Sequence, residues 1–222
     1  MKYLKIFVLL ILVTSCNKKE IQLPKIGEKG IANIQNNSSI WMFFNVIEND
    51  TVAVLNKNNK ISNTHLIFNI DKRLPLRVIM PKLYDIQEKL KKDSPHKSEG
   101  MRNYFNYADT LSKTYALFDF TNTNYIFTQE AYEKSISEIY EEKNRNPILI
   151  NIDKNSITID QEKSDDLYRK LKTKTANDSI KNRTIFLSFN KNLTYKKYLN
   201  TKTKLFNKGY KIENTEYIYS KE

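Results

Sequence analysis

The stretch LIFNIDKRLPL, residues 66–76, decides the fold unit of this chain, because it joins a strand to an amphipathic helix through a short turn. Residues 66–70 are mostly apolar and residues 71–73 are polar. From residue 76 onward the apolar side chains recur at intervals of three and four, which is the spacing of one helix face. They are Leu76, Ile79, Met80, Leu83, Ile86 and Leu90. The stretch therefore predicts a buried strand, a turn and a helix in that order.

A second stretch, IFLSFNKNLTY at residues 185–195, repeats this pattern 119 residues later. Asp71 matches Asn190, Leu74 matches Leu193, and the helical apolar positions that follow coincide at the same offset. Each stretch also comes after a strand, a turn that contains asparagine, and a second strand. We therefore expect two copies of one small fold. The alternative is that any strand–turn–helix sequence would align in this way.

The whole chain predicts an α+β protein made of two small mixed α/β units in tandem. The units cover residues 40–143 and 147–220, each of the type β-β-α-β-α-β, with a boundary at the NRNP stretch. Within the first unit, residues 101–111 are expected to be helical, because their apolar members are spaced three and four apart. Residues 129–143 are expected to form a further helix.

The N-terminus has the pattern of a bacterial lipoprotein signal peptide. Lys2 and Lys5 supply positive charge, and an apolar core of about eight residues follows, which is too short to cross a bilayer as a helix. Residues 13–16, Val-Thr-Ser-Cys, match the lipobox: an aliphatic residue, two small residues and cysteine. The sequence predicts removal of residues 1–15 and acylation of Cys16, because several chains such as palmitate anchor a protein stably. The alternative is an ordinary signal peptide with an incidental cysteine.

Lipidation would use the only cysteine of the chain, so no disulfide, thiolate metal site or cysteine nucleophile is predicted. Asn17 follows Cys16 where aspartate would signal inner-membrane retention, and this favours the periplasmic face of the outer membrane in the cell envelope. Residues 16–39 are polar and contain proline, glycine and an Asn-Asn-Ser-Ser run. They predict a flexible tether between the lipid and the folded body.

The 222 residues carry a net charge of +12, which falls by two when Lys2 and Lys5 leave with the signal. Such a charge favours anionic partners, among them lipid headgroups and polyanionic wall material. Nucleic acid is not an expected partner, because the protein lies outside the cell and has neither a dense basic block nor an aromatic RNA-binding motif. The alternative is a solvated lysine surface without a specific partner.

The sequence contains no recognisable catalytic, cofactor or metal motif. His65 and His96 are the two histidines, whereas a triad or a metal cluster needs several convergent ligands. The acidic pairs at residues 141–142 and 165–166 are adjacent on expected helices and so point about 100° apart. We therefore expect no enzyme, no metal and no cofactor. The alternative is a hydrolase of cell wall or glycan that uses a carboxylate pair assembled by folding.

Four residues are candidates for binding. Asn190 and Tyr195 flank the second turn, and Tyr217 and Tyr219 share one face of the last strand. Aromatic side chains on one strand face can bind a ligand, but the pattern favours packing in the core for Tyr217 and Tyr219.

Residues 147–220 resemble the periplasmic domain of the ExbD/TolR biopolymer-transport family, and residues 40–120 do so more faintly. The hairpin ILINIDKNSITID resembles that family's first two strands. The stretch IFLSFNKNLTYKKYLNTKTKLFNKGYKI resembles its strand, turn, helix, glycine and last strand. Asn190 stands where the family often has aspartate, whereas Leu193, Tyr195 and Gly209 fit its pattern.

The resemblance implies a binding or scaffold module rather than a motor. Members of the family carry an N-terminal transmembrane helix with an essential aspartate, but here the apolar stretch has no acid and ends at Cys16. What the resemblance implies is docking to a protein of a TonB- or Tol-like system or to peptidoglycan. An unpaired sheet edge would offer its backbone groups to such a partner. The oligomeric state stays open and is compatible with a dimer.

Overall fold

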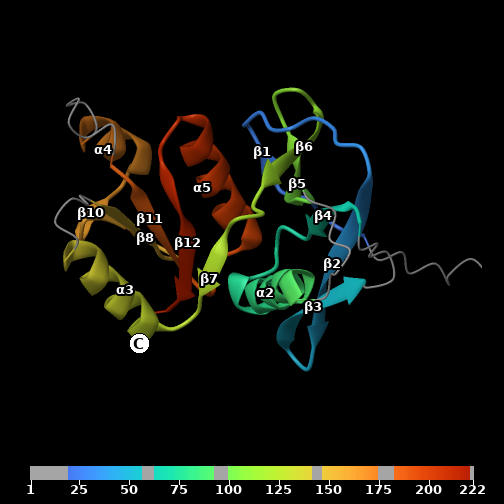
Figure 1. The fold of residues 1–222 in the computed structure, drawn as a ribbon, viewed down its shortest axis with the longest axis horizontal. Helices are drawn as coiled ribbons and strands as arrows, with labels where there is room; N and C mark the ends of the chain where they lie inside the picture. Colours follow the sequence, from blue (N-terminus) through green and yellow to red (C-terminus); the bar gives the residue numbers. More distant parts are fainter. Residues whose placement is uncertain (1–19, 57–62, 93–99, 142–146, 175–182, 221–222) are drawn as a thin grey trace, which may run out of the picture.

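Two β-sheets enclose a pair of helices in the computed structural model of this protein (Figure 1). The residues that it describes are 20–56, 63–92, 100–141, 147–174 and 183–220. Each sheet has six strands in this part of the chain. The predicted α+β fold class is confirmed, since helices and mixed sheets alternate along the chain.

The first sheet has the strand order β1-β5-β4-β2-β3, and β6 pairs with β5. The strands are β1 (Lys25–Ile26), β2 (Asn37–Ile47), β3 (Asp50–Asn56), β4 (His65–Ile70), β5 (Asn103–Asp109) and β6 (Thr114–Asp119). β2 and β3 form a hairpin whose turn residues, Glu48 and Asn49, both have positive φ, as a two-residue type I′ turn requires. Helix α2 (Leu76–Lys92) links the parallel strands β4 and β5.

The second sheet has the strand order β10-β9-β8-β11-β12-β7. The strands are β7 (Asn124–Ile126), β8 (Ile148–Ile152), β9 (Ile157–Ile159), β10 (Glu162–Ser164), β11 (Ile185–Asn190) and β12 (Ile212–Tyr219). The helices are α3 (Gln129–Glu141), α4 (Leu167–Lys174) and α5 (Tyr195–Asn207). From β8 onward the order is the predicted β-β-α-β-α-β, with the short strand β10 added before α4.

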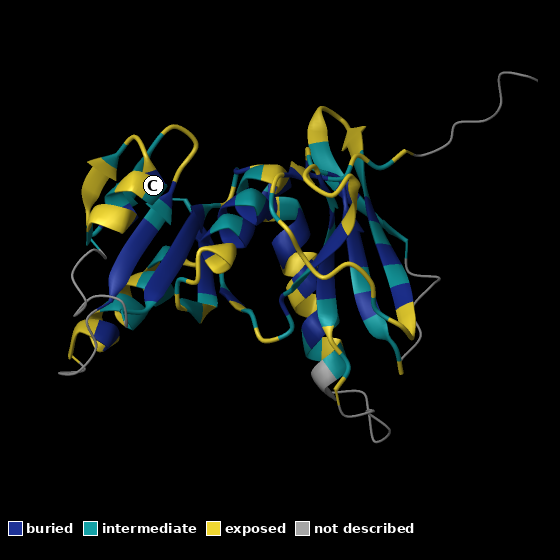
Figure 2. Cartoon of the chain, turned by 90° about the horizontal axis from the view of Figure 1, so that it is seen from above, coloured by how far each residue is buried: buried dark blue, intermediate teal, exposed yellow. Residues whose placement is uncertain are grey.

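Helices α2 and α5 form a layer between the sheets, and one hydrophobic core surrounds both (Figure 1). Figure 2 shows buried residues on both helices and on both sheets. The ring of Tyr198 on α5 packs against Phe105 of the first sheet, with centroids 6.1 Å apart, and against Phe189 of the second at 4.9 Å. The two predicted units therefore share a core rather than standing as separate domains.

The starts of α2 and α5 are joined by reciprocal backbone hydrogen bonds. The N–H of Leu76 donates to the carbonyl of Leu193 at 2.9 Å, and the N–H of Tyr195 donates to the carbonyl of Leu74 at 2.8 Å. Under the 119-residue offset Leu76 matches Tyr195 and Leu74 matches Leu193. A second reciprocal pair of bonds lies one residue further along each helix. The two strand–turn–helix stretches thus meet in a nearly twofold arrangement. The first unit, however, has the order β-β-β-α-β-β-β-α, so the predicted order β-β-α-β-α-β was wrong for it.

The two turns that lead into these helices also close in the same way. The Asp71 side chain accepts a hydrogen bond from the backbone N–H of Arg73 at 3.0 Å, and the Asn190 side chain accepts one from Asn192 at 2.8 Å. Aspartate and asparagine both favour this local turn, because their short side chains reach the backbone two residues on. The strand–turn–helix pattern therefore occurs twice in the structure.

The expected tether over residues 16–39 is folded from residue 20 onward. Lys25 and Ile26 pair with β5, and the Ile26 side chain is 1% exposed. Ile31 forms a β-bridge with Leu117 of β6. The tether prediction was wrong here because a polar segment can still supply backbone partners to a sheet edge. Residues 16–19 lie outside the described residues.

The helix expected at residues 101–111 is strand β5, and this prediction was wrong. Its neighbours β4 and β6 supply backbone partners on both sides, and alternation then buries Phe105 and Tyr107 against the helices. The expected unit boundary at residues 143–147 also does not coincide with the point where the chain passes from the first sheet to the second. Strand β7 pairs with β12, and Ile139 of α3 packs on the second sheet.

Candidate functional site

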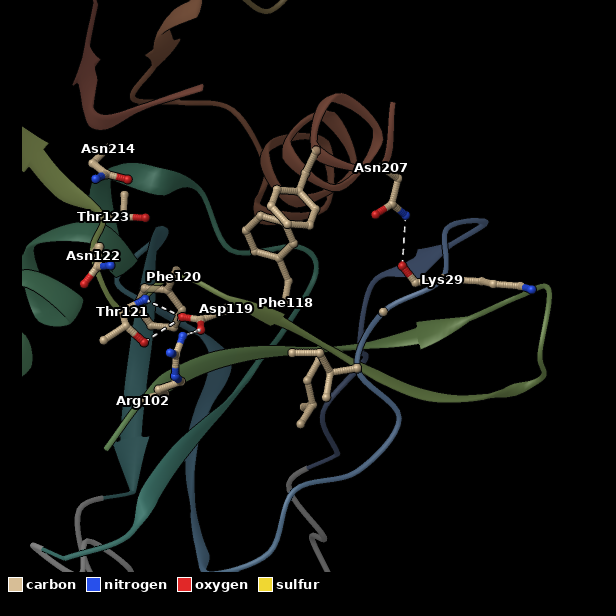
Figure 3. A pocket seen from close by; sticks show the side chains of 14 residues that line it. Lys29, Arg102, Phe118, Asp119, Phe120, Thr121, Asn122, Thr123, Asn207 and Asn214 are labelled. Atoms are coloured by element: carbon tan, nitrogen blue, oxygen red, sulfur yellow. Dashed lines mark hydrogen bonds and ion pairs between the residues drawn. The ribbon is translucent and has the colours of Figure 1, made fainter. Parts of the chain in front are cut away.

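A pocket of about 530 Å³ lies where the first sheet meets the end of α5 (Figure 3). Its walls come from the segment before β2, the residue before β5, the end of β6 with the loop that follows, the end of α5, and strand β12. The lining residues are Lys29, Gly30, Ile31, Arg102, Leu117, Phe118, Asp119, Phe120, Thr121, Asn122, Thr123, Phe206, Asn207 and Asn214. This volume is in the range of small-molecule sites in proteins.

The segment at residues 29–31 forms one wall and is fixed against β6. Ile31 and Leu117 exchange backbone hydrogen bonds of 3.0 and 2.9 Å. A side chain at Gly30 would place its Cβ 2.8 Å from the Leu117 carbonyl oxygen and 2.4 Å from the Tyr107 hydroxyl. Glycine is therefore required there, because only a residue without Cβ permits this close approach.

An ion pair forms the polar end of the pocket. Arg102 donates to the Asp119 carboxylate at 2.7 Å, and the hydroxyl of Thr121 donates to the same carboxylate at 2.6 Å (Figure 3). Burial opposes ionisation of Asp119, but the hydrogen bonds from Thr121 and Arg102 outweigh it and lower its pKa. Asp119 is thus a charged, occupied acceptor, and Arg102 is left more than half exposed beside the pocket.

Aromatic and amide side chains form the remaining surface. The rings of Phe118 and Phe206 meet edge to face with centroids 5.5 Å apart, and Phe206 is 62% exposed. Asn207 donates to the carbonyl of Lys29 at 2.9 Å and so ties α5 to the opposite wall. Asn122 and Asn214 add further amides to the lining (Figure 3). The pocket thus combines apolar ring surface with neutral donors and acceptors.

A buried charged network supports the inner wall. Lys202 on α5 and Glu216 on β12 are 3% and 1% exposed, and their charged groups lie 2.5 Å apart. The Tyr198 hydroxyl donates to Glu216 at 2.7 Å, and the Lys202 ammonium donates to Tyr198 at 3.2 Å and to Thr123 at 3.5 Å. The same ammonium lies 5.3 Å from the ring centroid of Phe118. The network therefore contacts two residues that line the pocket.

Burial raises the pKa of the Tyr198 hydroxyl well above its ordinary value, and the nearby Glu216 charge adds to this. Tyr198 therefore stays protonated and acts as a hydrogen-bond relay between Lys202 and Glu216. Replacing one partner of such a pair is costly, because the other charge is then buried alone.

The four predicted binding residues do not form one binding surface. Asn190 ends β11 and donates to Asp153 at 2.7 Å. Tyr195 and Tyr217 are 0% and 2% exposed, and the Tyr217 and Tyr219 rings are packed by Tyr132 of α3 with centroids 5.0 and 4.9 Å apart. Tyr217 and Tyr219 are buried under α3, although Tyr219 still lines a hollow beside that helix, and Tyr195 is buried against Phe105 of the first sheet. Cys16 lies outside the described residues.

The histidines and the other acidic residues of the described chain do not form a catalytic or metal site. The His65 ring accepts a hydrogen bond from the Arg102 backbone at 3.1 Å, and His96 lies outside the described residues. Within the described residues, no three histidine, cysteine, aspartate or glutamate side chains converge to hold a metal ion. Glu130 and Glu133 line another hollow beside α3, but both are exposed. A general acid is normally shielded from water.

The sequence contains one signal for the buried network. Lys202 falls on the apolar face of α5, between Tyr198 and Leu205, and Glu216 alternates with Ile218 on one face of β12. A single charge on each of two otherwise buried faces predicts an ion pair. The pocket itself had no such signal, because its walls come from distant parts of the chain.

No protein-family model matches the chain, and no curated protein or solved structure is significantly similar to it. In the part of the chain that the structure describes, none of the helices combines the length and the apolar character needed to cross a membrane.

Proposed function

We propose that this protein is a lipid-anchored binding module of the cell envelope, held through Cys16 at the periplasmic face of the outer membrane, and that its pocket binds peptidoglycan. The observation that carries the proposal is the pocket lined by Phe118, Phe206, Arg102 and several amides. The resemblance of residues 147–220 to the ExbD/TolR family supports the same role.

The chemistry of the pocket suits a wall fragment. Peptidoglycan presents sugar rings with apolar C–H faces, hydroxyl and N-acetyl groups, and peptide carboxylates. Phe206 offers an exposed ring for a sugar face, Asn214 and Asn122 offer amide donors and acceptors, and Arg102 offers a cation for a carboxylate. A concave site of this size suits a small group better than a flat protein surface, which needs a far larger contact area.

Binding without turnover fits this pocket better than hydrolysis. Glycoside hydrolysis uses two carboxyl groups that flank the bond to be cut. Among the lining residues Asp119 is the only carboxylate, and Arg102 and Thr121 already bond to it. A wall hydrolase would therefore need its catalytic pair elsewhere.

Peptidoglycan binding is tested by sedimenting purified protein with insoluble peptidoglycan. The full chain carries Cys16→Ala so that it stays out of lipid. Phe206→Ala should weaken binding about three- to tenfold, because a stacked ring contributes roughly 0.5–1.5 kcal/mol. Tyr140→Ala, an exposed ring on α3, is the matched control and should change nothing. Equal binding by the Cys16→Ala protein and by its Phe206→Ala and Tyr140→Ala variants contradicts the proposal, and so does the absence of binding by all three.

The lipid anchor at Cys16 is tested in cells that express either the wild-type protein or Cys16→Ala. Wild type should label with palmitate and fractionate with membranes, whereas Cys16→Ala should do neither and still sediment with peptidoglycan. An unlabelled wild-type protein with an intact N-terminus rules out the lipid anchor.

Docking of an envelope protein of a TonB- or Tol-like system is the second candidate, and the edge of the first sheet favours it. β3 is the last strand of that sheet, and its pairing with β2 is continuous. Residues 51–55, TVAVL, contain neither the lysine nor the proline that usually protects an edge. An extended segment of a partner would add there as a further strand. Val54→Lys should then abolish cross-linking to that protein and leave peptidoglycan binding unchanged.

A further inference from the structure

A second hollow, of about 480 Å³, lies at the far end of the second sheet from the peptidoglycan pocket. The β8–β9 turn, strand β10 and the first turn of α5 surround it. Its lining is Lys154, Asn155, Ser156, Ile157, Lys163, Ser164, Asp165 and Lys197. The lining therefore carries three lysines, two serines and one acid.

The hollow carries a net positive charge, because its three lysines outnumber its one acid, Asp165. Two nearby lysines are paired, Lys170 with Glu162 at 2.9 Å and Lys174 with Asp160 at 2.7 Å. Lys154, Lys163 and Lys197, by contrast, form no ion pair with a carboxylate of the described residues. Glu162 and Asp160 are thus paired with lysines outside the hollow, and the ammonium groups of Lys154 and Lys163 are left available.

The lysines project from a backbone that is held in place. The Lys197 ammonium donates to the carbonyls of Asp153 and Lys154 at 2.9 and 3.0 Å, which joins α5 to the β8–β9 turn. Asn190 donates to the Asp153 side chain at 2.7 Å and fixes the same turn. The Lys170 ammonium donates to the Lys163 carbonyl at 3.2 Å and holds β10. Asn190, a predicted binding residue, thereby shapes the hollow without lining it.

This donor set suits a phosphate group. Three lysines line the hollow and supply point charges, and the hydroxyl of Ser156 adds a neutral donor, whereas the Ser164 hydroxyl already donates to the Asp166 carbonyl at 2.9 Å. A phosphate has several oxygens and more than one negative charge, so it uses such a cluster fully. A single carboxylate is better matched by the planar fork of arginine, and no arginine lines this hollow.

We propose that this hollow is a binding site for a phosphate group of an anionic ligand, a site separate from the peptidoglycan pocket. Two sources present the same chemistry: the headgroup of an anionic phospholipid and a soluble phosphate or diphosphate. A protein anchored beside a bilayer meets the first at high local concentration. The two sources are separated by the test.

The test uses the full chain with Cys16→Ala and two probes. Inorganic diphosphate is titrated while backbone amide signals are followed by NMR, and vesicles of neutral phosphatidylcholine are compared with vesicles containing anionic phosphatidylglycerol. Lys154→Gln and Lys163→Gln are the variants, and Lys211→Gln, an exposed lysine on the chain before β12, is the charge-matched control. Any contribution of the N-terminus to vesicle binding is common to all of them.

We expect diphosphate to shift the amide signals of Ser156 and Ser164, and each site variant to weaken binding about fivefold, as one lysine near an anionic surface contributes. Lys211→Gln should change binding by less than twofold. A preference for anionic vesicles that the site variants lose identifies the headgroup as the source. Diphosphate binding without that preference identifies a soluble ligand. Absence of both, or equal loss in the control, overturns the site.

Discussion

Lys202 and Glu216 illustrate how single residues set the properties of the pocket wall. They are nine-tenths or more buried, and the Lys202 ammonium contacts Thr123 and the ring of Phe118. A buried ion pair rarely adds much stability over apolar residues of the same volume, but breaking it is expensive. Its presence beside the pocket therefore indicates that it orders this wall.

Lys202→Met should lower the free energy of unfolding by about 3–5 kcal/mol, because Glu216 is left buried without its partner. The double variant Lys202→Met with Glu216→Leu should be clearly more stable than the single one. Urea unfolding measures both, with Lys211→Met as the exposed control. A single variant as stable as wild type would show that water reaches Glu216.

At the scale of elements, the turn before each helix is the repeated unit. Asp71 closes the first turn and also accepts hydrogen bonds from the Arg73 guanidinium at 2.7 and 2.8 Å. Burial opposes ionisation of Asp71, yet the bonds from Arg73 and from the Gln22 backbone outweigh it and lower its pKa below the ordinary value of an aspartate. Asn190 closes the second turn without a charge. The same local geometry thus has an acid-sensitive and an acid-insensitive copy.

Asp71→Asn should keep the turn and cost about 1–2 kcal/mol at pH 7, through the lost charged bonds to Arg73. Since the folded pKa is lowered, the contribution of Asp71 is full above about pH 4 and disappears as pH falls through the folded pKa. The difference between wild type and variant should therefore shrink as the pH falls below about 4 in urea unfolding. Asp165→Asn, an exposed acid, is the control, and a difference that grows on acidification contradicts this account.

For the whole molecule, the shared helical layer couples the two sheets. α5 packs on β5 and β11 at once, and the helix starts exchange backbone hydrogen bonds. Removing either sheet would expose the apolar face of the other together with both helices. Cooperative folding of the entire body follows from this arrangement.

We expect residues 147–220 alone to show no cooperative thermal transition by circular dichroism, because their inner face loses its cover. Residues 20–122 and 123–220 expressed together should co-purify as one complex, since the reciprocal junction is preserved. Fragment 20–122 from which strand β6 has been removed is the negative control for this co-purification. A sharp transition for residues 147–220 alone would establish two separate domains.

The sequence by itself determined the strand–turn–helix pattern of residues 66–90 and its copy at 185–205. Alternation, helical spacing and an Asp or Asn that bonds its own backbone are local signals, so no distant contact is needed to read them. The lipobox at Cys16 is equally local, and it stays a prediction. Charge on an apolar face, as at Lys202, was readable in the same way.

Only the tertiary structure decided how those pieces are used. Strand neighbours β4 and β6 made residues 103–109 a strand where the spacing also fitted a helix. Cover by α3 turned Tyr217 and Tyr219 from binding candidates into core residues. The pocket beside the end of α5 joins residues from 29 to 214. Pairing, cover and convergence depend on residues far apart in the chain, and local patterns contain no information on which distant segments will meet.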